Sequence, residues 1–146
     1  MPTNPKKQPR SVYDSALSLK ASAAVTTSAA GSLIVDLGPG EWEGYLDIDV
    51  TAMDIVSNDE KYDIILQGSP DAAFGTAGNI VELMQFSLSA KEVKVSDSDK
   101  DDVIGHYVKP VKNLDFDGTP LRYMRIYTVV AGTTPTITYS AYLSKG

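Results

Sequence analysis

The sequence contains no cysteine and a single histidine, His106, among its 146 residues. The absence of cysteine excludes disulfide scaffolds, thiolate metal sites and cysteine nucleophiles. One histidine cannot form a zinc site built mainly on imidazole within one subunit. No Gly-x-Ser-x-Gly elbow accompanies it, so we interpret His106 as a surface or interface residue rather than a catalytic base. The residue inventory therefore predicts a protein without enzymatic activity.

Long apolar runs are also missing from this chain. No segment approaches the roughly 20 apolar residues that a membrane-spanning helix needs. The segment from Met1 to Arg10 is polar and holds three prolines, so a conventional signal peptide is not expected. We therefore expect synthesis in the cytoplasm and no membrane partner.

Charge is distributed unevenly along the chain. The net charge is −6, but residues 1–10 contain Lys6, Lys7 and Arg10 and no acidic residue, which leaves −9 for the rest. An acidic body repels nucleic acids and most membrane surfaces, so neither is an expected partner. We interpret residues 1–12 as a flexible, basic, proline-rich arm. Either the arm stays solvated, or it orders on an acidic partner surface, with Lys6, Lys7 and Arg10 as candidate contacts.

Hydrophobic residues recur with a period of two almost everywhere. From Gly44 to Met53, for example, Leu46, Ile48 and Val50 alternate with polar residues, as in a half-buried antiparallel strand. Within 80–88 the apolar parity slips near Leu83, which predicts a β-bulge. The expected strands cover residues 33–37, 44–53, 61–67, 80–88, 103–113, 121–130 and 135–143, with a further one within 13–28.

Turn-forming residues separate these expected strands, and no segment shows a convincing amphipathic helix. The turn signals fall at 38–40, 57–59, 68–70, 75–78, 115–118 and 132–135. Pro110 places the expected strand 103–113 at a sheet edge or a bulge. The pattern predicts one all-β domain over 13–146, a single antiparallel β-sandwich of the jelly-roll type with an extended N-terminal arm.

An acidic segment at 97–102 is a candidate cation-binding loop. Asp97, Asp99 and Asp101 have the opening spacing of a calcium loop, but Asp102 and Val108 replace the glycine and glutamate that an EF-hand requires. A solvated loop, a cation site and a contact with a basic partner all stay open for 97–102, and we predict no metal.

Glu41 and Glu43 flank Trp42, the only tryptophan. This arrangement is compatible with a sugar-binding platform, although a core or interface plug is the simpler interpretation. The loop Gly75–Gly78 lacks the lysine of a phosphate-binding loop, so no nucleotide or other cofactor is expected.

Arginine and tyrosine gather near residue 125. On a strand, Tyr123, Arg125 and Tyr127 share one face, whereas Met124 and Ile126 share the other. Tyrosine and arginine are enriched at interface centres, so we assign the first face as a candidate contact surface. The alternative is a second buried face with Arg125 paired internally.

These features together resemble a known family, the capsid cement (decoration) proteins of tailed phages. The resemblance rests on residues 46–52, 68–71, 74–75, 122–127, 131–135 and 137–143. It implies a jelly-roll homo-oligomer, a dimer rather than a trimer, on the exterior of the virion capsid. Its partner would be the major capsid protein, whose neighbouring subunits it would clamp together. Alternatives are another virion β-sandwich, such as a tail or fibre component, or a carbohydrate-binding module.

Overall fold

The computed structural model describes residues 15–75, 79–90 and 103–145. In these ranges the regular structure is β-strand, apart from the single 3₁₀ turn η1 (Ser15–Leu17). No helix in this part of the chain is long and apolar enough to cross a membrane. The strands are β1 (Ser18–Val25), β2 (Ala29–Ala30), β3 (Val35–Asp36), β4 (Glu43–Met53), β5 (Lys61–Ser69), β6 (Val81–Ser89), β7 (Gly105–Lys112), β8 (Tyr123–Ala131) and β9 (Ile137–Ser144).

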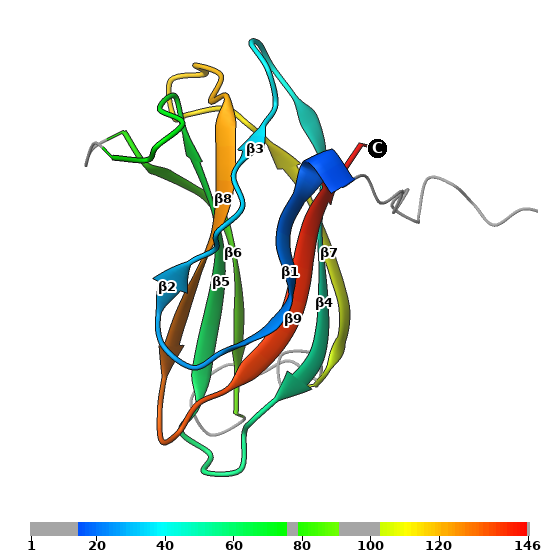
Figure 1. Ribbon diagram of the computed structural model, residues 1–146, viewed down its shortest axis with the longest axis vertical. Helices are drawn as coiled ribbons and strands as arrows, with labels where there is room; N and C mark the ends of the chain where they lie inside the picture. The colour runs from blue at the N-terminus through cyan, green and yellow to red at the C-terminus, as the bar shows by residue number, and fades with distance from the viewer. Residues whose placement is uncertain (1–14, 76–78, 91–102, 146) are drawn as a thin grey trace, which may run out of the picture.

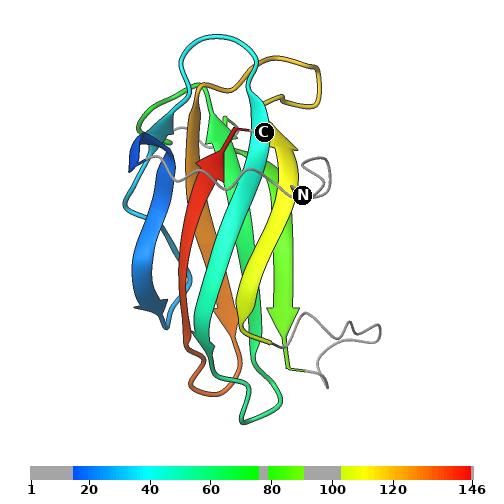
Figure 2. The same ribbon diagram turned by 90° about the vertical axis from the view of Figure 1, so that its right-hand side faces the viewer.

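The strands form two antiparallel sheets that face each other (Figure 1). Sheet A has the order β1-β9-β4-β7, and Figure 2 looks onto its outer face. Sheet B has the order β2-β8-β5-β6, with β3 also paired to β8. The prediction of an all-β antiparallel sandwich is confirmed. Residues 1–12, predicted to form the arm, lie outside the described residues.

The core lies between the sheets and is filled by alternate side chains from both. Leu46, Ile48 and Val50 of β4 are at most 2% exposed. Opposite them, Ile64 and Leu66 of β5 are fully buried. The period-two division of β4 into a core face and an outer face therefore holds, because antiparallel strands send successive side chains to opposite sides.

A bulge in β6 occurs at the predicted position. Leu66 of β5 pairs with Met84, whereas the next residue, Gln67, pairs with Glu82, so Leu83 has no partner in the register. The extra residue lets Val81, Leu83 and Met84 all pack against the core despite their mixed parity.

The outer strands of sheet A carry features that discourage pairing with a further strand. In β7, Pro110 removes a backbone donor, as the sequence suggested for an edge. In β1, register shifts surround Lys20, whose Nζ donates to the carbonyls of Ala23 (2.7 Å) and Tyr139 (2.8 Å). Burial of this ammonium group lowers the pKa of Lys20. Binding surfaces are therefore better sought on the sheet faces and loops than on these edges.

Candidate protein-interface surfaces

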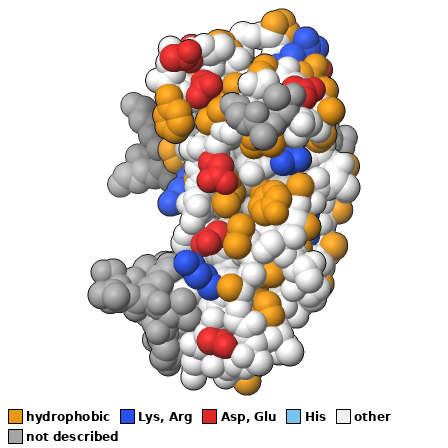
Figure 3. Space-filling model, turned by 90° about the vertical axis from the view of Figure 1, so that its left-hand side faces the viewer, with side chains coloured by type: hydrophobic (Ala, Val, Ile, Leu, Met, Phe, Trp, Pro, Cys, Tyr) orange, Lys and Arg blue, Asp and Glu red, His pale blue; other side chains and the backbone are white. Residues whose placement is uncertain are grey.

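The predicted contact residues of β8 lie on the outer face of sheet B. Met124 and Ile126 point into the core, and Tyr123, Arg125 and Tyr127 alternate with them on the other side, each half-buried. Figure 3 shows hydrophobic, acidic and basic side chains interspersed on this face, without one continuous apolar patch. The three residues thus share a face, as expected, and that face is chemically mixed.

Arg125 is held by neighbours within its own chain. Its Nε donates to Oε1 of Gln67 on β5 at 2.8 Å, and its guanidinium carbon lies 4.4 Å from the ring centroid of Phe74. Phe74 belongs to the loop 70–75 and is only 6% exposed. Cation–π contact and the hydrogen bond both fix the guanidinium. Arg125 therefore has the internal partners of the alternative interpretation, and Tyr123 and Tyr127 are the more available parts of the stripe.

Tyr123 lies beside a second fixed arginine. Arg122 makes a bidentate ion pair with Asp36, with Nε–Oδ1 at 2.7 Å and Nη2–Oδ2 at 3.0 Å. Its guanidinium carbon lies 5.4 Å from the Tyr123 ring centroid. The Arg122 hydrogen bond, followed by one from the Gly38 amide, lowers the pKa of Asp36. The pair holds β3 against β8 and orders this corner of the face.

The other candidate contact residues and the acidic segment lie outside the residues that the structure describes. Lys6, Lys7 and Arg10 lie outside the described residues, and so does the acidic segment 97–102. Among residues 15–75, 79–90 and 103–145, no group of three or more acidic, histidine or cysteine side chains could hold a metal ion.

The single histidine contacts a buried carboxylate on the outer face of sheet A. Nε2 of His106 lies 3.0 Å from Oδ1 of Asp47, and Oγ of Ser144 donates to Oδ2 at 2.6 Å. Asp47 is 0% exposed. In a catalytic triad the imidazole lies between the hydroxyl and the acid. Here the carboxyl group lies between the other two, so this is not the triad arrangement, and the cluster instead gives a buried carboxyl group hydrogen-bond partners.

A loop at one end of the sandwich is anchored by Asn113. Its side chain is fully buried, accepts from the Trp42 amide (2.7 Å), and donates to the carbonyls of Gly40 (3.0 Å) and Leu121 (2.9 Å). Backbone bonds link Asn113 to the same tryptophan and leucine. One asparagine therefore fastens the base of the loop 113–121 to the neighbouring loop 38–42.

The tip of this loop is a tight turn that presents an aromatic ring to solvent. The Gly118 amide donates to the Asp115 carbonyl at 2.9 Å, and Gly118 has φ +85°, a conformation that favours glycine. Oδ1 of Asp115 accepts from the Phe116 amide, and Oδ1 of Asp117 accepts from the Thr119 amide. Phe116, between the two aspartates, is 96% exposed. Hydrogen bonds thus hold the backbone of the turn that carries Phe116, whose ring makes almost no contact with its own chain.

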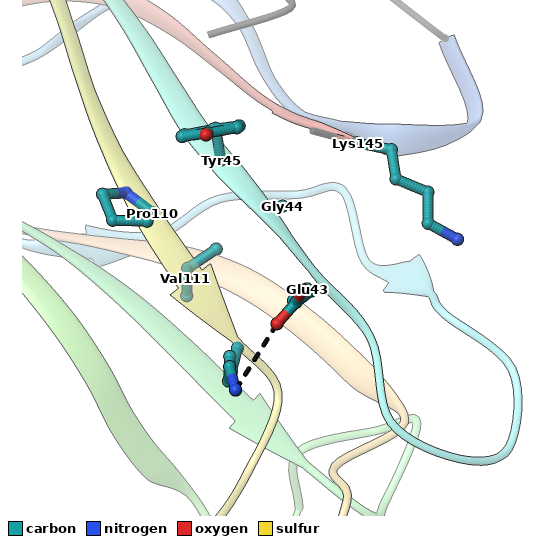
Figure 4. A pocket seen from close by; sticks show the side chains of 7 residues that line it. Glu43, Gly44, Tyr45, Pro110, Val111 and Lys145 are labelled. Atoms are coloured by element: carbon teal, nitrogen blue, oxygen red, sulfur yellow. Dashed lines mark ion pairs between the residues drawn. The ribbon is translucent and has the colours of Figure 1, made fainter. Parts of the chain in front are cut away.

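A pocket of about 470 Å³ opens at the same end of the molecule, on the outer side of β4 and β7 (Figure 4). Tyr45 and Pro110, which are cross-strand partners, line it together with Val111. The side chains of Lys112 and Lys145 bring positive charge to its edge, which is called the rim below. It is lined by Glu43, Gly44, Tyr45, Pro110, Val111, Lys112 and Lys145.

Glycine is required at the wall of this pocket. A Cβ atom on Gly44 would lie 2.2 Å from the Ser144 carbonyl oxygen and 2.6 Å from the Trp42 ring. The rim cation Lys112 pairs with Glu43 at 3.4 Å and with Glu41 at 4.0 Å. Trp42 packs partly buried against the core, which favours its interpretation as a plug rather than an exposed sugar platform.

Sequence reasoning missed two of these features. The sequence predicts only a turn at 115–118, although a phenylalanine between two aspartates of an Asp-x-Asp-Gly turn is itself a signal of an exposed ring. Asp47 lies on the outer face of β4, and nothing in its alternation with Leu46 and Ile48 signals that it is buried.

No protein-family model and no curated protein sequence matches this chain.

Proposed function

We propose that this protein is a structural binding module without enzymatic activity, and that it acts as a capsid cement protein on the outside of a tailed-phage head. In this role it binds the major capsid protein as a homo-oligomer, a dimer rather than a trimer, and stabilises contacts between neighbouring capsid subunits. The phage assignment rests on the sequence resemblance described above.

The strand orders support a jelly roll as the form of the sandwich. A jelly roll has eight strands in two sheets and contains two Greek-key motifs. The orders β1-β9-β4-β7 and β2-β8-β5-β6 alternate between early and late strands in both sheets, as such a winding requires. The long connections place loops at both ends, and a rigid sandwich loses little conformational freedom on docking.

The observation that carries the proposal is the order of the β8 outer face. Tyr123 and Tyr127 are partly exposed there, while Arg122 is fixed by Asp36 and Arg125 by Gln67. Interface hot spots are enriched in tyrosine and arginine, and their side chains bind most tightly when their conformations are already set. This face therefore suits a protein partner.

Cementing would work through several contacts made at once. One domain offers a patch of ordinary size, with an affinity that depends on its hot spots. An oligomer that engages two capsid subunits raises the effective concentration of the second contact, so weak contacts combine into lasting attachment. The capsid subunits are then held together by the bound protein.

The direct test is co-sedimentation of the purified protein with phage heads that lack it, followed by thermal rupture of the heads. We expect saturable binding and rupture at a higher temperature. The variant carrying Tyr123→Ser and Tyr127→Ser should bind at least about tenfold more weakly. Val56→Ser, at an 87% exposed apolar residue, is the control and should bind normally. Absence of binding by the unaltered protein would contradict the cement function.

A further inference from the structure

We propose that two copies of this chain associate through a reciprocal contact, in which Phe116 of each copy enters the pocket lined by Tyr45 and Pro110 of the other. The inference gives a surface to the homo-oligomer included in the proposed function and depends on that part alone. It does not depend on the capsid.

The backbone that carries the inserted ring is ordered before any partner binds. Phe116 is 96% exposed, yet its loop is closed by hydrogen bonds at the turn and anchored at its base by the buried Asn113. An exposed aromatic ring on an ordered loop loses little conformational entropy when it is buried in a partner. Aromatic anchors of this kind dominate protein interfaces when they fill a pocket.

The pocket has the size and lining that such a ring needs. A dry cavity of about 150 Å³ accepts benzene, and this open pocket measures about 470 Å³. Tyr45 and Pro110 stand opposite each other on β4 and β7, with Val111 next to them (Figure 4). Tyr45 and Pro110 offer an aromatic and an aliphatic surface to a phenyl ring, whereas the Val111 side chain packs in the core.

Charge complements shape in this pairing. The inserted ring is flanked by Asp115 and Asp117, and the charged residues that line the pocket are Lys112, Lys145 and Glu43. Lys112 is shared with Glu43 at 3.4 Å, so Lys145 is the cation that we assign to the incoming carboxylates. A second copy brings two carboxylates toward this rim, which favours this orientation over others.

The positions of ring and pocket allow the contact to close on itself. The loop 113–121 follows directly from Lys112 at the rim of the pocket, so both features lie at one end of the sandwich (Figure 2). A two-fold axis near that end would place each Phe116 ring in the pocket of the other copy, as an isologous interface requires. The expected product is therefore a dimer rather than an open chain of subunits.

Sedimentation velocity of the full chain over roughly 1 to 200 µM tests this pairing. We expect a monomer–dimer equilibrium for the unaltered protein. Phe116→Ser should weaken association roughly a hundredfold or more, because each dimer contains two rings and each contributes tenfold or more. Lys145→Glu should weaken it too, because the variant places a carboxylate where the incoming Asp115 and Asp117 meet a cation. Val56→Ser should associate normally.

A protein that stays monomeric throughout this range would overturn the inference. So would a dimer that Phe116→Ser leaves unchanged, or one that Val56→Ser weakens equally; species larger than dimers would overturn the reciprocal geometry. Circular dichroism of each variant establishes that it is folded. Because no phage head enters this experiment, its failure and a failure of the head-binding assay are separate results.

Discussion

Two loops at the same end of the sandwich each contain a phenylalanine, and the two side chains differ in how far they are exposed (Figure 1). The loop 70–75 buries Phe74 to 6% exposure beneath the Arg125 guanidinium. The loop 113–121 leaves Phe116 96% exposed. Both are ordered by aspartate side chains that accept backbone amides, Asp71 in the first and Asp117 in the second.

The difference shows that order in a loop does not depend on burying its largest side chain. Phe74 adopts φ +51°, which costs conformational energy and is offset by its contacts with the sheet. Phe116 makes no comparable contact, so the free energy of burying its ring is still available to a partner. We infer that the first phenylalanine serves the fold and the second serves binding.

The largest expected effect comes from releasing the exposed loop at its base. Asn113→Ala removes three side-chain hydrogen bonds and leaves the Trp42 amide and two carbonyls without them. We expect a loss of about 3 kcal/mol in the free energy of unfolding, since buried unsatisfied groups cost about 1–3 kcal/mol each. Urea titration measures it. A loss below about 1 kcal/mol would show that the anchor is unimportant for the loop.

A smaller effect is expected when the buried ring is removed. Phe74→Ala should lower the free energy of unfolding by about 2 kcal/mol, because the ring loses its apolar burial and its contact with Arg125. The same urea titration applies, at a concentration low enough for the protein to be monomeric, with Phe116→Ala as the matched control. Equal losses in the two variants would contradict the claim that Phe74 stabilises the fold and Phe116 does not.

A still smaller effect concerns the order of the exposed loop in solution. Hydrogen bonds from the Thr119 side chain and amide lower the pKa of Asp117. Because the pKa of Asp117 is lower in the folded protein, the ionised carboxylate stabilises the loop fully at pH values above the ordinary pKa of about 3.9. This contribution is lost as the pH falls through the lowered pKa of the folded state. NMR titration of the Asp117 carboxyl carbon should show the lower pKa, and Thr119→Val should move it upward. A titration at the ordinary value would mean that the turn is open.

Much of the fold could be predicted because burial in a sandwich repeats every two residues. The alternation of Leu46, Ile48 and Val50 gave the strand and its core face, and the parity slip at Leu83 gave the bulge. The weaker segment 13–28 predicted a strand without defined bounds, since the exposed run Ala21, Ser22, Ala23 and Ala24 of β1 carries no contrast between faces.

The candidate surfaces were less predictable, because they depend on loops meeting strands. Parity alone placed Tyr123, Arg125 and Tyr127 on one face, but Phe74 reaches Arg125 only through the path of the loop 70–75. The clamp at Asn113 likewise joins residues about 70 positions apart, which no local pattern encodes. The pocket requires the pairing of Tyr45 with Pro110 across two strands.

The most direct test of the central claim is the dependence of thermal unfolding on protein concentration, for the unaltered protein and for Phe116→Ser. Association of the native state stabilises it by mass action, so the unaltered protein should unfold at a higher temperature as its concentration rises. Phe116→Ser should show no such rise, and its curve should coincide with that of the dilute unaltered protein. A variant that unfolds at a lower temperature even at high dilution would contradict the account, since Phe116 would then belong to the fold.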